Sequence, residues 1–265
     1  MDISVKPIPE PIRTLKVDAL TVQVYETPDD VALAASARAH EVLSKAIEAR
    51  GEASAIFATG RSQLQFLDYL THSESGLPWQ KITGFHLDEY LGISAQHPAS
   101  FRYYLQQHLT RKVTLAQWHG IEGDAQQPIA VCETYAKLLQ QYPADLCCLG
   151  VGNNGHLAFN DPSVADFCDR HSVKLVRLDE INRQQQVDSS AFDTLSAVPQ
   201  YAFTLTLSAI AKTANALCLA YGSGKANIVQ TLLSGPIDER CPASVLRKMN
   251  QAALFVDLEA ISLYE

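Results

Sequence analysis

The sequence predicts an α/β fold: a single domain with a doubly wound, mostly parallel sheet and helices on both faces, a Rossmann-like arrangement. Two observations predict it. Short apolar runs alternate along the chain with segments whose apolar residues recur at helical spacing, which is the pattern of βαβ units. The length of 265 residues and the composition, 47% hydrophobic and 19% charged, are those of an ordinary globular chain. We expect residues 1–16 to form an extended N-terminal segment and residues 17–265 to form the domain.

The expected strands are short and rich in apolar or β-branched residues, as strands buried on both faces are. The clearest of them has the sequence DLCCLGV. In chain order, the expected strands cover Thr21–Tyr25, Ser54–Ala58, Ile82–Leu87, Asp145–Val151, Val173–Leu178, Phe203–Leu207, Ala216–Tyr221 and Ala253–Val256.

Helices are expected between these strands. The first is capped by Asp29 or Asp30 and covers Val31–Arg50. Because ligands of such folds lie beyond the carboxyl ends of the strands, polar residues directly after strands are the candidates for a site. The other expected helices are a stretch that ends at Leu70, Pro98–Leu109, Cys132–Gln141 and three segments that begin near Asp179, Ser223 and Ala243.

The charge balance excludes some classes of partner. The chain carries 21 basic and 29 acidic residues, a formal net charge of −8. This argues against general binding of nucleic acid or of an anionic membrane surface, which needs a clustered basic face. Met1–Val17 lacks the apolar core of a secretory signal, and Tyr201–Tyr221 is too polar for a membrane span. The six cysteines have no metal-ligand spacing, so we expect no metal and a reduced, cytoplasmic location.

The first candidate site segment, Ala58–Ser62, joins an expected strand to an expected helix. Its glycine lets the backbone approach an anion, and the free amides of the helix's first turn can donate to that anion. The segment is neither a Walker loop nor a GxGxxG motif. A plain strand–turn–helix connection, with Ser62 as the cap, is therefore the alternative interpretation.

The second segment places Asp88 and Glu89 directly after the third expected strand. Carboxylates in that position can be held in a cleft of low polarity and tuned as bases. Alternatively, either carboxylate caps the turn that follows. His97, which precedes Pro98, is interpreted as a helix-start residue.

The third segment runs from Gly150 to Asp161 and begins with three glycines and two asparagines within six positions. Such a composition forces a tight loop with positive-φ sites. The loop presents His156 beyond a buried strand, and Asp161 can orient its imidazole and stabilise the charged form. A histidine that a glycine-rich loop presents in this way indicates a functional role, although a single histidine more often serves in packing.

These segments together resemble the glucosamine-6-phosphate deaminase (isomerase) family, within the superfamily that also includes 6-phosphogluconolactonases. The resemblance extends from Val17 to Asp257 and is most specific where GNNGHLAFNDP follows LDEY. The matching segments are FATGRS, HLDEYLGIS with HPASF, LGVGNNGHLAFNDP, and YGSGKA.

The resemblance implies an enzyme that opens a phosphorylated aldose ring, moves a proton between C2 and C1, and releases the C2 amine as ammonia by hydrolysis. Glucosamine 6-phosphate and water would give fructose 6-phosphate and ammonia. Asp88 matches the family's proton-shuttling aspartate, His156 its ring-opening histidine, and Asp161 an acidic partner that is usually glutamate. Neither step requires a metal or an organic cofactor.

The same resemblance assigns the phosphate to the segment after the second strand, with Lys225 supplying the cation. Arg183 roughly matches a second phosphate-binding arginine, and a helix-surface arginine is the alternative. The expected site residues are, for catalysis, Asp88, His156, Asp161 and Asn154, and, for binding substrate and phosphate, Thr59, Gly60, Arg61, Ser62, Glu89, Gly155, Arg183 and Lys225.

Three departures from the family pattern leave the particular amino sugar open. Asn154 lies where some members carry aspartate, so a histidine–carboxylate relay is lost at that point. Asp161 is one methylene shorter than the usual glutamate, which changes its reach. The segment Arg61-Ser62-Gln63 stands where a small residue and Thr-Pro are more usual.

Two other functions compete with deamination. Lactonases of the superfamily typically carry Asp-Glu-Arg and Asp-Gly-His-Thr, where this chain has Asp88-Glu89-Tyr90 and Asn154-Gly155-His156-Leu157. A non-catalytic sugar-phosphate sensor needs a DNA-binding segment, and the stretch before residue 17 is too short for a helix-turn-helix. The expected partner is a small-molecule sugar phosphate, and a homo-oligomer is compatible with the sequence.

Overall fold

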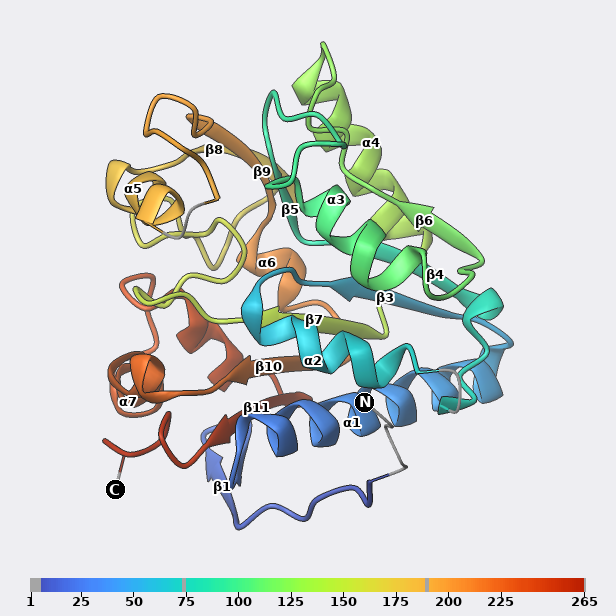
Figure 1. The fold of residues 1–265 in the computed structure, drawn as a ribbon, viewed down its shortest axis with the longest axis vertical. Coiled ribbons are helices and arrows are strands. Elements are labelled where there is room, and N and C mark those ends of the chain that lie inside the picture. The colour runs from blue at the N-terminus through green and yellow to red at the C-terminus, as the bar shows by residue number, and fades with distance from the viewer. Residues whose placement is uncertain (1–5, 73–74, 189–190, 265) are drawn as a thin grey trace.

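An eight-stranded sheet runs through the middle of the molecule (Figure 1). The computed structural model describes residues 6–72, 75–188 and 191–264, and in them the doubly wound α/β fold is confirmed. Every neighbouring pair of strands in this sheet is parallel except the first. In spatial order the strands are β1 (Arg13–Val17), β2 (Leu20–Tyr25), β11 (Ala252–Asp257), β10 (Ala216–Ala220), β7 (Leu146–Gly150), β3 (Ala53–Phe57), β4 (Ile82–His86) and β6 (Gln117–His119).

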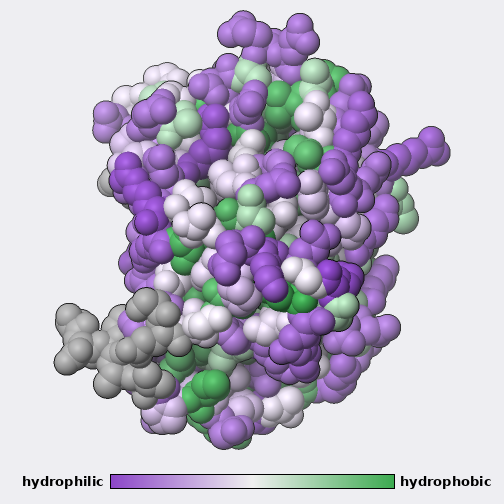
Figure 2. Space-filling model, turned by 90° about the vertical axis from the view of Figure 1, so that its right-hand side faces the viewer, coloured by the Kyte–Doolittle hydropathy of each residue, from purple (hydrophilic) through white to green (hydrophobic). Residues whose placement is uncertain are grey.

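Helices cover both faces of this sheet because successive strand residues point to opposite faces. One face packs against α1 (Pro28–Arg50), α2 (Arg61–Leu70) and α3 (Phe101–Leu105). The other packs against α4 (Pro128–Gln141), α6 (Leu207–Ile210) and α7 (Ala226–Ser234). The outer surface is mainly hydrophilic on the side shown in Figure 2, with hydrophobic residues scattered over it.

The first helix begins earlier than its expected cap. Thr27 is the N-cap, and its side chain accepts a hydrogen bond from the Asp30 backbone while the Asp30 carboxylate accepts from the Thr27 backbone. This reciprocal capping box satisfies two amide donors at the helix start. The expectation that Asp29 or Asp30 is the cap is therefore wrong: Asp30 is the third helical residue, and Asp29 pairs with Lys6.

A second, antiparallel sheet was not expected. It consists of β5 (Asp88–Tyr90), β9 (Tyr201–Leu205) and β8 (Val173–Arg177), in that order. Figure 1 shows β8 and β9 beside α5 (Glu180–Asp188), above the large sheet. The two sheets meet where the Leu205 amide donates to the Leu87 carbonyl, at 2.8 Å. Asp88 and Glu89 consequently lie in a short strand of their own and not in a loop.

Other differences are local. β1 begins inside the segment 1–16 that was expected to be extended, of which residues 1–5 lie outside the described residues. The expected helix over Pro98–Leu109 is a single α turn followed by a π-helical turn, Gln106–Thr110. The segment that begins near Ala243 is a 3₁₀ helix, Pro242–Lys248. None of the described helices is long and apolar enough to cross a membrane.

The strand order reverses between β3 and β7. From β3 the chain proceeds to β4 and β6 on one side, whereas β7 is followed by β10 and β11 on the other. In doubly wound folds the loops at such a reversal diverge to opposite faces and leave a crevice at the carboxyl ends of the strands. Two of the three candidate segments lie at this reversal, because one follows β3 and another follows β7.

Candidate active site

The segment after β3 turns sharply into α2. Gly60, the N-cap, has a φ of 103°, which an L side chain rarely adopts, and no side chain caps the helix. The first amides of α2 therefore lack an intrahelical partner. Ser62 lies against the end of β7, since a Cβ added to Gly150 would be 2.9 Å from its hydroxyl oxygen. The buried Gln63 fixes this contact by donating to the Leu149 carbonyl at 3.2 Å.

Lys225 reaches the loop after β7 from the neighbouring strand. It ends the 3₁₀ turn Ser223–Lys225 that follows β10. Its Nζ donates to the Val151 carbonyl at 2.9 Å and to Asn153 Oδ1 at 2.7 Å. Partial burial lowers the pKa of this ammonium from its usual value. A cation held in a partly dry position at the carboxyl edge of the sheet is suited to an anionic group.

The His156 ring is oriented by two oxygen atoms at Nδ1. Asn154 Oδ1 lies 2.8 Å from Nδ1 and Asp161 Oδ1 lies 3.1 Å from it. The Asn154 amide donates to the same Asp161 oxygen at 2.9 Å, which fixes the direction of the amide. Because both neighbours of Nδ1 are acceptors, Nδ1 carries the proton in the neutral ring and Nε2 is left as the base. Asp161 thus places a carboxylate beside the His156 ring, where Asn154 has only an amide.

The glycines of this loop give the imidazole its place. A Cβ on Gly152 would lie 2.1 Å from the His156 Cε1 atom, so the ring occupies the space of the missing side chain. Gly155, with a φ of 87°, packs against Cys241, and its carbonyl accepts from the Ala243 amide. These close approaches explain why the loop is rich in glycine.

Asp88 and Glu89 have opposite surroundings although they are adjacent. The Glu89 carboxylate is fully buried and accepts hydrogen bonds from the backbone and side chains of Ser100, Phe101 and Arg102. It therefore caps α3 and pairs with the partly buried guanidinium of Arg102. The Asp88 carboxylate is 7% exposed, and within the described residues nothing forms a hydrogen bond or ion pair with it. Burial, and secondarily the charge of Glu89, hold the pKa of Asp88 well above its usual value.

The backbone before Asp88 is held rigidly by His86. Its Nε2 accepts from the Ile121 amide at 2.7 Å, and Tyr135 contacts both its backbone amide and its carbonyl. Burial lowers the pKa of His86 to about 3, so the ring stays neutral. Sequence reasoning missed this residue, because its partners are 35 and 49 positions away.

The remaining expected residues are less closely joined to this group. Thr59 is half-buried at the end of β3, and Arg61 is exposed. Arg183 donates to the carbonyls of Leu195 and Val198, so its guanidinium holds a loop and its role toward phosphate stays a prediction.

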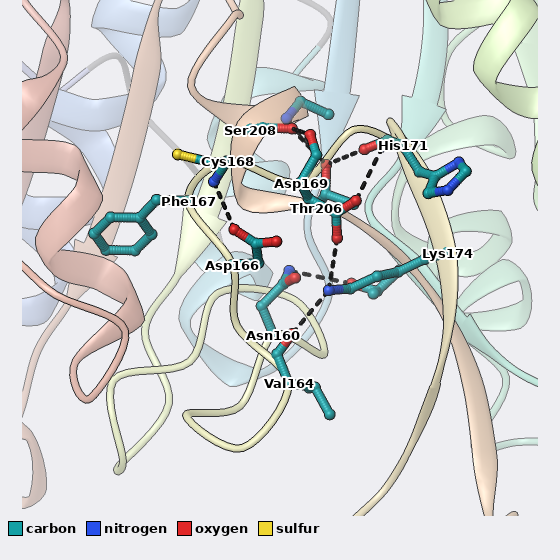
Figure 3. A network of polar contacts seen from close by, with 12 residues as sticks. Asn160, Val164, Asp166, Phe167, Cys168, Asp169, His171, Lys174, Thr206 and Ser208 are labelled. Atoms are coloured by element: carbon teal, nitrogen blue, oxygen red, sulfur yellow. Dashed lines mark hydrogen bonds and ion pairs between the residues drawn. The ribbon is translucent and has the colours of Figure 1, made fainter.

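The chain that leaves the histidine loop is pinned by polar contacts (Figure 3). The buried Asn160 donates to the carbonyls of Leu157 and Leu205. Lys174 forms an ion pair with Asp169 at 2.9 Å and donates to the Val164 carbonyl at 2.8 Å. These bonds tie the segment after Asp161 to β8 and β9. Within the described part of the chain, no three His, Cys, Asp or Glu side chains gather into a possible metal site.

Comparisons with known proteins agree with this arrangement. Residues 26–255 match the family described as glucosamine-6-phosphate isomerases/6-phosphogluconolactonase. A glucosamine-6-phosphate deaminase of Listeria monocytogenes serotype 4a (strain HCC23) is 31% identical over 232 residues, which is 87% of this chain and 96% of that protein. A glucosamine-6-phosphate deaminase of Streptococcus pneumoniae (strain 70585) is 33% identical over 229 residues, 86% of this chain and 93% of the relative.

Solved structures give the same result for the fold. A monomeric glucosamine-6-phosphate deaminase superposes with a TM-score of 0.84 at 29% identity, covering 91% of this chain and 99% of the other. A 6-phosphogluconolactonase from Shewanella baltica OS155 superposes with a TM-score of 0.72 at 18% identity, covering 89% and 96%. The second likeness concerns the fold alone.

Proposed function

We propose a function from one premise: the chain belongs to the family of glucosamine-6-phosphate isomerases and 6-phosphogluconolactonases. Within it, we infer that this protein is a deaminating aldose–ketose isomerase. It converts an amino sugar 6-phosphate, glucosamine 6-phosphate in the first instance, and water into fructose 6-phosphate and ammonia. The relatives that are 31% and 33% identical carry the name of this activity.

The observation that carries the proposal is the buried carboxylate of Asp88, with which no described residue forms a hydrogen bond or an ion pair. Moving a proton between adjacent carbon atoms needs a base that can also return the proton as an acid. A carboxyl group whose pKa is raised above its usual value can both accept and return the proton. Lactone hydrolysis needs only a base to activate water, and His156 would suffice for it.

We assign each step of the reaction to one of these side chains. His156 Nε2 accepts the proton of the C1 hydroxyl and returns it to the ring oxygen, which opens the ring. Asp88 removes the proton from C2 and delivers it to C1, and a proton of the C2 amine passes to O1. C1 thereby changes from an aldehyde to a hydroxymethyl group, and the C2 amine becomes an imine. Water adds to C2 and ammonia leaves, which gives the ketose. Asp161 stabilises the imidazolium that forms during ring opening.

The phosphate is assigned to the first amides of α2, the hydroxyl of Ser62 and the ammonium of Lys225. Ser62 contacts the end of β7, and Lys225 contacts the loop that follows β7, which supports assigning both to one site. Arg61 and Thr59 lie in the same turn and are proposed as further contacts. Arg183 is proposed as a second cation that changes its partners when substrate binds.

We also propose a reducing, cytoplasmic location. All six cysteines are free, five of them buried in the fold and Cys168 exposed. Burial raises the pKa of the Cys148 and Cys218 thiols, which keeps them protonated and unreactive.

The test is a panel of substrates. Purified protein, dialysed against a chelator, is given the 6-phosphates of glucosamine, galactosamine and mannosamine, and ammonium and ketose are measured. We expect stoichiometric ammonium and ketose 6-phosphate from at least one of them. 6-Phosphogluconolactone is the competing substrate. Its hydrolysis, with no ammonium from any amino sugar phosphate, would assign the chain to the lactonase side of the family.

A further inference from the structure

Two tyrosine hydroxyls donate hydrogen bonds to the turn between β3 and α2. Neither tyrosine is among the proposed site residues. Tyr104, at the end of α3, donates to the Gly60 carbonyl at 2.8 Å. Tyr221, directly after β10, donates to the Arg61 carbonyl at 2.9 Å. The two donors are 44 and 160 positions from their acceptors, so neither contact follows from the local chain.

These bonds control the direction of two amides. A trans peptide is planar, and its C=O and N–H point in opposite directions. The Gly60 carbonyl shares its peptide with the Arg61 amide, and the Arg61 carbonyl shares its peptide with the Ser62 amide. Holding the two carbonyls therefore aims the first two amides of α2 out of the helix start. These N–H groups have no acceptor within the helix, because the first amides of any α-helix lack a carbonyl partner.

The turn needs such a restraint. Gly60 has the backbone freedom of a glycine, and the helix has no side-chain cap to hold its first turn. Burial raises the pKa of both phenols, so both hydroxyls keep their protons and remain donors at neutral pH. Within the turn, the Gly60 carbonyl accepts from the Gln63 amide at 3.0 Å, and the two tyrosine hydroxyls add restraints that come from outside the helix.

Tyr221 has a second connection. The next residue, Gly222, donates its amide to the Asp257 carboxylate, and the chain then turns directly into Lys225. Tyr221 therefore joins the turn before α2 to the segment that carries the cation. Its bond fixes the separation between the two halves of the proposed phosphate site.

We propose that Tyr104 and Tyr221 are positioning residues that hold the amides of Arg61 and Ser62 toward the phosphate group of the substrate. They act through the backbone and do not touch the substrate. The proposal rests on the proposed function in placing a phosphate at this turn. It adds two residues, outside the loop, that determine affinity for that group.

The experiment uses substitutions that remove only the hydroxyl group: Tyr104→Phe, Tyr221→Phe and the double variant. Tyr69→Phe is the matched control, because Tyr69 lies on α2 and its hydroxyl donates to Asp29, away from the turn. KM and kcat for glucosamine 6-phosphate are measured, together with the dissociation constant of inorganic phosphate by calorimetry.

We expect each single variant to raise KM and to weaken phosphate binding by about three- to tenfold, the range of one neutral hydrogen bond. kcat should change less than twofold, and the Tyr69→Phe control should change neither constant. A general loss of stability would lower the melting temperature without this separation of KM from kcat.

Unchanged phosphate binding in both single variants would overturn the proposal, as would a wild-type protein that does not bind inorganic phosphate. A wild-type protein that binds phosphate but releases ammonium from no amino sugar phosphate would refute the proposed function alone. In that case weaker phosphate binding by the phenylalanine variants would still support the two tyrosines as positioning residues.

Discussion

Asp88 and Glu89 show how two identical functional groups acquire different roles at the scale of single residues. The Glu89 carboxylate is saturated by hydrogen-bond donors at the start of α3, which gives it a structural role. Asp88 has only burial and a neighbouring negative charge, both of which favour the protonated form. A buried carboxyl group with a raised pKa is typical of acid–base sites.

The raised pKa of Asp88 gives a prediction for stability. An unfolded aspartate titrates near 3.9. Between that pH and the raised pKa, the folded protein binds a proton that the unfolded chain has released, so the free energy of unfolding falls as pH rises. Asp88→Asn removes this penalty. We expect the variant to be more stable than wild type at pH 7, with the difference vanishing below about pH 4.

Urea unfolding at both pH values measures this difference. A variant that is less stable than wild type at neutral pH would show that the Asp88 carboxylate has favourable partners in the folded protein. A variant that is more stable than wild type at neutral pH would show that the charge of Asp88 destabilises the folded protein. Such a cost is expected of a residue that serves function and not packing.

The pair of His156 and Asp161 gives a second prediction at this scale. His156→Asn should lower kcat by about 10²–10⁴-fold, the usual range for an acid–base group. Asp161→Asn should lower it by about 10–100-fold through loss of a charge-assisted hydrogen bond. Because Asp161 acts through His156, the double variant should lose less than the product of the two single losses.

The control is Asp145→Asn, which removes an ion pair with Arg50. Asp145 directly precedes β7, the strand whose other end leads into the loop that carries His156. It should lower the melting temperature and leave kcat unchanged. Fully multiplicative losses in the His156 and Asp161 double variant would show that the two residues act independently.

At the scale of elements, the pattern of apolar residues in the sequence predicted most strands of the large sheet. Strands such as β3 and β10 are buried along their whole length, so continuous apolar runs predicted them to within a residue or two. β5 and β6 have only three residues each, too few for a pattern. β1 is largely exposed, and its sequence RTLKV gives little apolar signal.

The second sheet could not be predicted for a different reason. β8 and β9 were recognised as strands, but their partner is decided by contacts between distant segments. β9 pairs antiparallel with both β5 and β8, and this pairing leaves no trace in composition or period. The role of Glu89 could not be predicted for the same reason, since the donors that join it to α3 lie 11 to 13 residues later.

At the scale of the whole molecule, three of the segments that carry candidate residues lie side by side where strand order reverses. The turn after β3 contacts the end of β7, and Lys225 after β10 contacts the loop after β7. Arg183 instead binds carbonyls 12 and 15 residues away in an irregular segment, so its role toward phosphate stays a prediction.

The central claim is that Asp88 transfers the proton between C2 and C1. Its most direct test is the rate at which hydrogen leaves C2 of glucosamine 6-phosphate, followed by NMR with substrate deuterated at that carbon. Wild type should remove this hydrogen during turnover. Asp88→Asn, which keeps nearly the same volume, should remove it about 10²–10⁴-fold more slowly and still bind the substrate. Removal of the C2 hydrogen at the wild-type rate in Asp88→Asn would contradict the account.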